Sequence, residues 1–176
     1  MVSDIPKIEA YDESKLESLQ NCLGISISKK ELLESAITSS KAREKNPHLE
    51  LEDLDRLAFI GDSILYFIAS EYVLRKFKDI DDKGKLHEER EKYKQDKNLE
   101  RLVTLNKLDE FFWYEEKYQR QPPSNKWIEL TATFMEAIVG AIYLDSKDIN
   151  SARDFIESYI IEKINTILNL SNATFT

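Results

Sequence analysis

The stretch Leu57-Ala58-Phe59-Ile60-Gly61-Asp62-Ser63-Ile64-Leu65-Tyr66-Phe67-Ile68 carries one carboxylate inside a long apolar run. A second stretch, Ala132-Thr133-Phe134-Met135-Glu136-Ala137-Ile138-Val139-Gly140-Ala141-Ile142, repeats this arrangement. Neither stretch has a Lys or Arg one turn from its acid. A carboxylate taken out of water without a partner costs several kcal/mol. Each acid is therefore expected to be protonated, paired with a cation or bound to a metal ion.

Each stretch also has a glycine close to its acid, Gly61 beside Asp62 and Gly140 one turn after Glu136. A glycine inside a helix costs about 1 kcal/mol relative to alanine, and close packing of two helices is the usual compensation. The pattern predicts two helices that cross tightly at their glycines, with the two acids facing each other. A divalent cation would remove their repulsion, and oxygen ligands without a His or Cys cluster favour Mg²⁺ or Mn²⁺ over zinc. The alternative is that each acid lies on a solvated helix face or pairs with a distant lysine.

The same two helix faces carry further polar residues. Asp55 lies two turns before Asp62, while Glu129 and Thr133 lie two turns and one turn before Glu136. These positions predict contacts to a bound metal through water, from Asp55, Thr133 and Glu129. The more ordinary alternative is that the flanking acids are simply solvated.

Helical periodicity dominates the rest of the chain, and no stretch alternates with a period of two for long. The predicted fold is all-α, with a loose segment at 1–12, a single domain at 13–170 and a tail at 171–176. The expected elements include long apolar helices at 51–77 and 127–144, a continuous charged helix at 85–103, a terminal amphipathic helix at 151–170 and a polar loop at 39–48. Ser28 is expected to cap a helix over 29–38, and Gly24 is expected to end the helix before it.

The 176 residues include 25 basic and 33 acidic side chains, which gives a formal net charge of −8. Overall charge therefore gives no support for nucleic-acid binding, which would need a local basic patch or a metal ion. The single cysteine, Cys22, excludes an intramolecular disulfide and favours a reducing compartment. No uninterrupted apolar run reaches the roughly 18 to 20 residues of a membrane span, and the first residues form neither a signal nor a transit peptide. A cytoplasmic protein without a membrane partner is expected.

Four motifs occur here in the order that they have in the ribonuclease III family. They are an opening hairpin at 23–39, the signature helix that begins Asp55-Arg56 and continues through the first apolar run, a connecting helix with Gly84-Lys85-Leu86, Arg90 and Asn98-Leu99, and a second acidic helix at 134–145. The resemblance covers about residues 13–165. It implies an all-helical endonuclease domain that forms a homodimer and cuts double-stranded RNA with Mg²⁺, for which Mn²⁺ would substitute.

The family's metal site ordinarily takes four acids, of which Asp62 and Glu136 match. Ala58 stands where the family has an acid one turn before the aspartate, and Thr133 where it has one three residues before the glutamate. Mini-III, a branch without the double-stranded-RNA-binding domain, is similar at both positions and is an active ribonuclease, and this chain too is expected to lack that domain. The resemblance thus implies that Asp62 and Glu136 hold the metal and carry catalysis. The alternatives are a degenerate member that binds RNA without cutting it, and an all-α interaction module.

The resemblance also implies two interaction surfaces. Double-stranded RNA would be held mainly through its phosphates, and the basic candidates in two loops are Lys41, Arg43, Lys45, Lys117, Arg120 and Lys126. Ordinary solubilising side chains are the alternative for each of them. The apolar face of the signature helix, formed by Phe59, Ile60, Ile64 and Phe67, implies a dimer interface, with plain core as the alternative.

Overall fold

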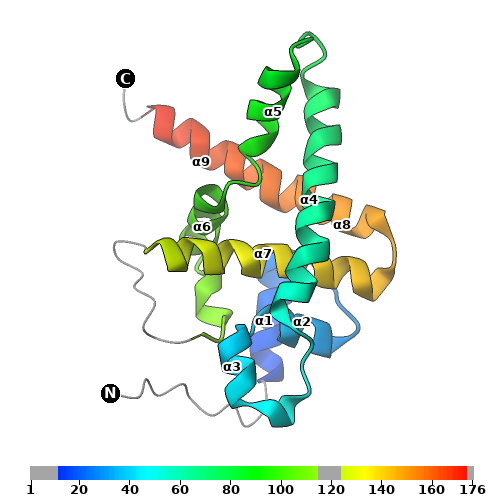
Figure 1. The fold of residues 1–176 in the computed structure, drawn as a ribbon, viewed down its shortest axis with the longest axis vertical. Coiled ribbons are helices and arrows are strands. Elements are labelled where there is room, and N and C mark those ends of the chain that lie inside the picture. Colours follow the sequence, from blue (N-terminus) through cyan, green and yellow to red (C-terminus); the bar gives the residue numbers. More distant parts are fainter. Residues whose placement is uncertain (1–11, 115–123, 174–176) are drawn as a thin grey trace.

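The computed structural model describes residues 12–114 and 124–173. Within these residues the regular secondary structure is helical apart from one isolated bridge between Thr38 and Trp113, so the fold is all-α, as predicted (Figure 1). The α-helices are α1 Glu13–Leu23, α2 Lys30–Ala36, α3 Ser40–Lys45, α4 Leu54–Lys76, α5 Lys83–Glu91, α6 Asp96–Leu105, α7 Asn125–Ser146, α8 Ile149–Phe155 and α9 Glu162–Ala173. Two 3₁₀ turns, Pro47–Leu49 and Leu108–Phe111, and a π-helical segment, Ile156–Ile161, complete the described elements.

The long helices α4 and α7 cross at the centre of the molecule (Figure 1). Side-chain caps set where both begin. Asp53 accepts a hydrogen bond from the Asp55 N–H at 2.9 Å at the start of α4, and Ser124 accepts one from the Trp127 N–H at 3.1 Å at the start of α7. Such caps satisfy backbone donors that a helix leaves unpaired in its first turn. The two long apolar helices predicted from the sequence are therefore present.

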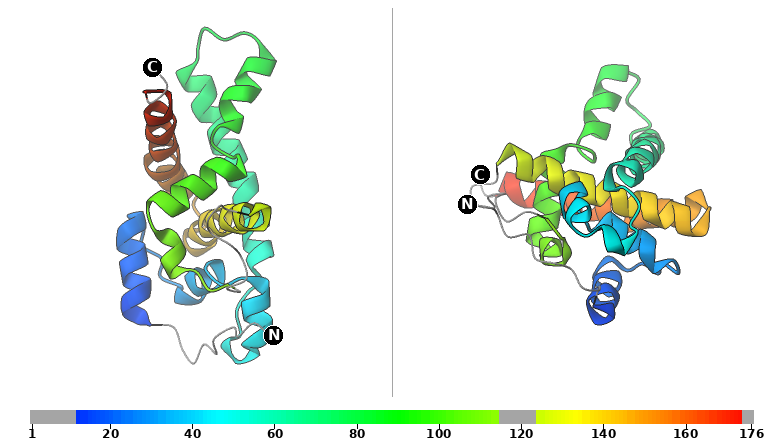
Figure 2. Two further views of the ribbon diagram at one scale, coloured as in Figure 1. Left: turned by 90° about the vertical axis from the view of Figure 1, so that its left-hand side faces the viewer. Right: turned by 60° about the horizontal axis from the view of Figure 1, so that its bottom comes forward.

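The second half of α4 and α5 form a hairpin that projects from the rest of the molecule (Figure 2). The chain then turns and continues as α6, so the prediction of one continuous helix over 85–103 is wrong. The cause of the break is tertiary. Tyr93 is buried and its hydroxyl donates to Asn165 Oδ1 on α9 at 3.0 Å, while the Asn98 amide donates to the Lys92 carbonyl oxygen at 2.8 Å. These contacts fix the turn between the two helices.

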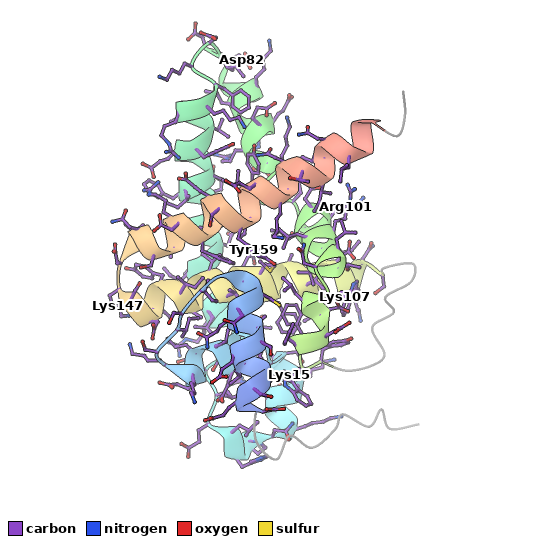
Figure 3. The ribbon with its side chains drawn as sticks, turned by 180° about the vertical axis from the view of Figure 1, so that it is seen from behind. Lys15, Asp82, Arg101, Lys107, Lys147 and Tyr159 are labelled. Carbon is purple, nitrogen blue, oxygen red and sulfur yellow. The ribbon has the colours of Figure 1, made fainter. Side chains whose placement is uncertain are left out.

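The C-terminal segment runs as one rod from Ile149 to Ala173 and includes the π-helical segment near its middle. Seen from behind, this rod lies across the molecule, with Tyr159 in its central part (Figure 3). Tyr159 stacks on Phe155 with ring centroids 5.3 Å apart, and burial raises the pKa of the Tyr159 hydroxyl to about 12. The predicted amphipathic helix at 151–170 is thus present, and it buries its apolar face on the core.

The short helices α1 and α2 illustrate one prediction that is confirmed and one that is wrong. Gly24 ends α1 in a left-handed conformation, with φ of 67°, as the sequence indicates. Ser28, however, does not cap α2, because Lys29 occupies the cap position without a side-chain cap. Instead, the N–H groups of Ser28 and Lys29 donate to the Asp145 carboxylate of α7 at 3.0 and 2.9 Å. A distant acid therefore holds the backbone just before α2.

The predicted polar loop at 39–48 is also wrong, because most of it is helical. Ser39 caps α3 by accepting a hydrogen bond from the Ala42 N–H at 3.2 Å. The Ser39 N–H itself donates to the Trp113 carbonyl oxygen at 2.8 Å, and the Trp113 N–H donates to the Ile37 carbonyl oxygen at 2.7 Å. This bridge to a distant segment holds Ser39 in the cap position, which favours the helix.

By length and composition alone, α4 and α7 could cross a membrane. A criterion that requires an uninterrupted apolar run does not identify these helices as possible membrane spans, because an acid interrupts each run. In the structure the apolar windows of these helices are 44% and 61% buried within the protein, and the helices pack on each other. Core helices of a globular fold pass the same test of length and composition.

Candidate active site

The backbones of α4 and α7 touch at Gly61 and Gly140. A Cβ atom on Gly61 would lie 1.8 Å from the carbonyl oxygen of Glu136, and one on Gly140 would lie 2.2 Å from that of Leu57. Cβ atoms do not approach backbone so closely, so glycine is required at both positions. The predicted tight crossing at the two glycines is confirmed.

At the crossing, Asp62 and Glu136, called here the acid pair, lie close enough for the charge of Asp62 to act on Glu136. The pKa of Glu136 is raised to about 7, first by burial and then by the negative charges of Asp62 and Asp96, against which Lys94 acts in the opposite direction. The Asp62 side chain remains 43% exposed. Burial and the nearby negative charges both disfavour the charged form of Glu136, and a bound cation would favour it. The acid pair is therefore suited to bind a cation.

A lysine from the turn between α5 and α6 already contacts Asp62. The Nζ atom of Lys94 lies 3.3 Å from Asp62 Oδ1, and it also lies 5.3 Å from the ring centroid of Tyr66. For Asp62, the structure thus shows the alternative that the sequence left open, a distant lysine. In the continuous helix predicted at 85–103, Lys94 is one of several similar lysines, so no local signal singles it out.

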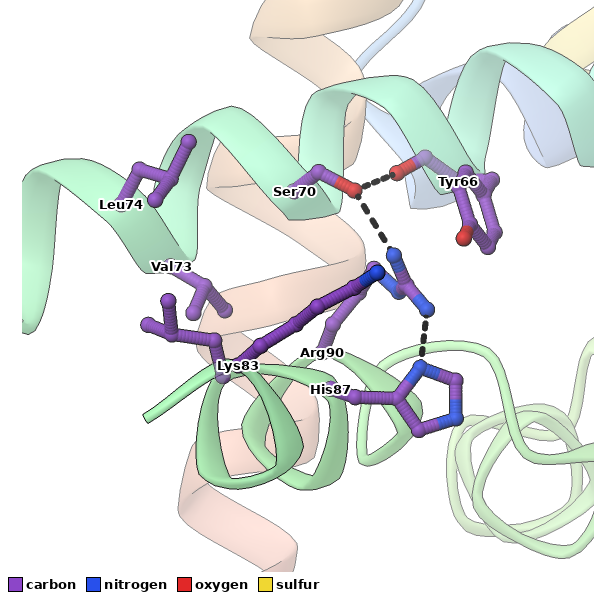
Figure 4. Close-up of a pocket in the computed structure, with 8 residues that line it drawn as sticks. Tyr66, Ser70, Val73, Leu74, Lys83, His87 and Arg90 are labelled. Atoms are coloured by element: carbon purple, nitrogen blue, oxygen red, sulfur yellow. Dashed lines mark hydrogen bonds between the residues drawn. The ribbon is translucent and has the colours of Figure 1, made fainter. Parts of the chain in front are cut away.

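Tyr66 also contacts Arg90 of α5, which packs on α4 beside the acid pair. The guanidinium carbon of Arg90 lies 3.8 Å from the ring centroid of Tyr66, and the guanidinium group donates to Ser70 Oγ at 3.4 Å and contacts the His87 ring (Figure 4). These residues line a pocket of about 210 Å³ between α4 and α5. Arg90 thus joins α5 to α4 within the projecting hairpin.

Asp55, Glu129 and Thr133 lie together, but in a different place. All three line an open pocket of about 300 Å³ where α4 and α7 begin. The Thr133 hydroxyl donates to the Glu129 carbonyl oxygen at 2.8 Å. The acid pair does not line this pocket. The contacts to a metal through water predicted for these three residues stay a prediction.

The basic residues predicted to contact RNA have different environments. Lys41 on α3 and Lys126 in the first turn of α7 line the same 300 Å³ pocket. Arg43 is ion-paired with Asp53, the residue that caps α4, so its charge is engaged within the fold. The others are Lys45, exposed at the end of α3, and Lys117 and Arg120, which lie outside the described residues.

The metal ligands available at the crossing are few. Across residues 12–114 and 124–173, no group of three or more carboxylate, His or Cys side chains is placed to hold a metal ion. The donor set is the acid pair alone. Mg²⁺ is commonly bound by one or two carboxylates together with water and substrate phosphates. The acid pair fits Mg²⁺ or Mn²⁺ held jointly with a phosphate, and it does not fit a zinc site.

Known proteins similar to this chain share both its sequence pattern and its fold. Residues 55–147 match the ribonuclease III domain family. Ribonuclease 3 of Chloroflexus aggregans is 30% identical over 155 residues, which are 87% of this chain and 66% of that protein. Ribonuclease 3 of Enterococcus faecalis is 31% identical over 153 residues, 87% of this chain and 65% of that protein. The chain thus spans slightly less than two thirds of the length of these relatives.

Solved structures agree at the level of the fold. The nuclease domain of Campylobacter jejuni ribonuclease III has a TM-score of 0.69 at 23% identity, and the match covers 84% of this chain and 95% of that one. A second structure of that domain, with a TM-score of 0.69 at 24% identity, is described as showing structural flexibility in the region involved in its dimer formation. From the matched residues, the relatives and the helical fold together, this chain belongs to the ribonuclease III domain family.

Proposed function

We propose that this chain is a divalent-metal-dependent endoribonuclease that hydrolyses phosphodiester bonds in double-stranded RNA and leaves a 5′ phosphate and a 3′ hydroxyl. The observation that carries the proposal is the acid pair, two carboxylates set against each other at a crossing where only glycine fits. Relatives that share about 30% identity over most of the chain are named ribonuclease 3, which supports the same reaction class.

Asp62 and Glu136 would hold the cation from opposite helices. A bound Mg²⁺ or Mn²⁺ would activate a water molecule for attack on the phosphate and stabilise charge on the leaving 3′ oxygen. Because Ala58 and Thr133 provide no carboxylate, the chain supplies only two charged ligands. Affinity for the ion is therefore expected to be weaker than in a site with four acids, and to depend on the substrate phosphate. The close contact of the two helix backbones would keep the positions of the two carboxylates fixed while RNA binds.

The test is cleavage of a plain duplex RNA by the purified protein with Mg²⁺, with Mn²⁺ and with EDTA. Cleavage is expected only with a divalent ion, and Asp62→Asn is expected to abolish it. Asp154→Asn, which removes an exposed acid on α8, is the matched control and should cleave as the wild type does. Cleavage by Asp62→Asn at the wild-type rate, or in EDTA, would contradict the proposal.

A degenerate member of the family, which binds RNA without cutting it, is the second candidate. The observation that favours it is the ion pair between Lys94 and Asp62, which places a positive charge on the acid pair without a metal. The same experiment separates the two functions. A duplex that is retained by the protein but stays intact with Mg²⁺ and with Mn²⁺ would favour the degenerate member.

The second part of the proposal is a homodimer formed through the exposed side of α4. Phe59 is 78% exposed and Phe67 is 51% exposed, whereas Ile64 on the same predicted face is buried in the core and Ile60 is partly buried against it. Aromatic side chains this exposed on one helix are typical of an interface. The predicted apolar face therefore divides into a core part and a part available to a second copy.

Sedimentation equilibrium tests the homodimer. Phe59→Glu is expected to weaken self-association by at least about thirtyfold, the effect of losing one dominant aromatic contact. Leu105→Glu changes a residue that is 65% exposed on α6 and is the matched control, expected to leave self-association unchanged. A monomeric wild-type protein at high concentration would contradict this part of the proposal.

The third part of the proposal is that RNA phosphates contact the rim of the pocket that Lys41 and Lys126 line. These lysines come from α3 and α7 and line one pocket, next to the start of α4. Lys41→Glu combined with Lys126→Glu is expected to weaken duplex RNA binding and to flatten its dependence on salt, because fewer phosphates would be neutralised. If the double variant binds duplex RNA with the same dependence on salt as the wild type, this part of the proposal is contradicted.

A further inference from the structure

The turn between α5 and α6 holds Lys94 against the acid pair in a defined way. The two residues before Lys94 are anchored, because Tyr93 is buried with its hydroxyl bonded to Asn165, and the carbonyl oxygen of Lys92 accepts from Asn98. The Tyr93 ring also packs edge-on against Tyr72 of α4, with centroids 5.5 Å apart. The backbone at Lys94 is therefore fixed to the same helix that carries Asp62.

The Lys94 side chain points to the acid pair and is largely shielded from solvent. Its side chain is 24% exposed, its Nζ atom lies 3.3 Å from Asp62 Oδ1, and its positive charge also acts on Glu136. Tyr66 lies below the ammonium group at 5.3 Å and provides the face of an aromatic ring, which attracts a cation. One lysine thus contacts Asp62 and lies near enough to Glu136 for its positive charge to act on both carboxylates.

We propose that the Lys94 ammonium group is a built-in counter-cation of Asp62 and Glu136, which a divalent ion must displace from Asp62 in order to bind between the two carboxylates. This inference rests on the proposed metal-dependent function and adds a determinant of metal affinity to it. A divalent ion bound to Asp62 would repel an ammonium group on the same carboxylate, so both cannot keep their full interaction. The divalent ion gains two carboxylates at once and carries twice the charge, so the lysine gives way.

The structure also offers the displaced ammonium group other partners. Lys94 lines an open pocket of about 750 Å³ whose other charged residues are Glu91, Asp96, Lys97 and Glu129. A lysine has a flexible stem and a strongly hydrated head, so it can turn into this pocket at little cost while it stays near Tyr66. Displacement therefore does not require the turn between α5 and α6 to unfold.

The experiment measures Mn²⁺ binding to the full chain without RNA, by calorimetry or by electron paramagnetic resonance of the free ion. Lys94→Met is expected to bind Mn²⁺ roughly tenfold more tightly than the wild type, because the competing charge is gone. Lys97→Met removes the same charge from the same pocket and is the matched control, expected to change affinity by less than about twofold. Lys94→Arg keeps a cation on Asp62 and is expected to bind no more tightly than the wild type.

Two further measurements make the outcomes distinct. Thermal melting in EDTA shows that each variant is folded, and Asp62→Asn shows that the Mn²⁺ observed is bound at the acid pair. Equal Mn²⁺ affinity in the wild type and Lys94→Met, or equal tightening in Lys97→Met, would overturn the inference and leave the metal site in place. No Mn²⁺ binding by either the wild type or Lys94→Met at millimolar concentration would overturn the proposed metal-dependent function and the inference with it.

Discussion

Two pairs of acids lie on the same two helices, seven residues apart, but the burial and the surroundings of the two pairs differ. The acid pair, Asp62 and Glu136, lies at the point where the backbones of α4 and α7 touch, and Glu136 is partly buried there. The outer pair, Asp55 and Glu129, is exposed and lines an open pocket together with lysines. The residue types and spacing are alike. The distance from the glycine crossing decides whether a carboxyl group is partly buried with a raised pKa, as Glu136 is, or stays exposed, as Asp55 and Glu129 do.

The largest expected difference between the two pairs is in catalysis. Glu136→Gln removes a charged ligand at the crossing and is expected to lower the rate of duplex RNA cleavage by about a thousandfold or more. Glu129→Gln is the matched change in the outer pair and is expected to lower it by less than about tenfold. Rates measured at saturating Mg²⁺ check this. An equal loss in both variants would mean that the two pairs act as one site.

The next largest effect concerns the crossing itself. Gly61→Ala would place a Cβ atom 1.8 Å from the Glu136 carbonyl oxygen, so the helices must separate. The free energy of unfolding is expected to fall by about 3 kcal/mol, the upper range for overpacking a core. Gly84→Ala in the first turn of α5, where a Cβ atom meets only the Asp82 side chain at 3.1 Å, is the control. It is expected to change stability by about 0.5 kcal/mol or less, and urea denaturation would show whether the two differ.

The smallest effect is a dependence of stability on pH. In the folded protein without metal the pKa of Glu136 is about 7, against an ordinary value of 4.5. Between these values the folded state binds more protons than the unfolded state, so stability falls as the pH rises from 4.5 to 7 and then levels off. Glu136→Gln lacks this loss. Its stability relative to the wild type should rise from near zero below pH 4.5 to about 2 kcal/mol above pH 7, after allowance for partial exposure.

Urea denaturation in EDTA at a series of pH values measures this difference. A stability difference between Glu136→Gln and the wild type that stays constant over the whole pH range would show that burial at the crossing does not disfavour the Glu136 charge. The contrast between the two pairs of acids would then rest on geometry alone.

Much of the central arrangement could be predicted from particular residues. Gly61 and Gly140 inside apolar helices conflict with local propensity, and a close backbone approach is the physical reason to accept that cost. An acid in an apolar run also carries a cost that needs a compensating interaction, and on this ground Asp62 and Glu136 indicated the candidate site. Gly24 likewise predicted where α1 ends.

Other features could not be predicted, because their causes lie far away in the chain. The break between α5 and α6 depends on the burial of Tyr93 against α4 and on its bond to Asn165 of α9. The backbone just before α2 is held by Asp145, which is 117 residues from Ser28. The exposure of Phe59 and the burial of Ile64 on one apolar face also depend on which helices cover α4.

The sequence by itself was enough to predict that two apolar helices pack at their glycines and bring two acids to that contact. The physical reason is that a mid-helix glycine and an acid in an apolar run each carry a local cost. Close helix packing offsets the first, and protonation or a cation offsets the second. Only the tertiary structure decided which positive charge meets Asp62. Lys94 reaches it because a helix break, held by side chains from other helices, turns one lysine among several toward the crossing.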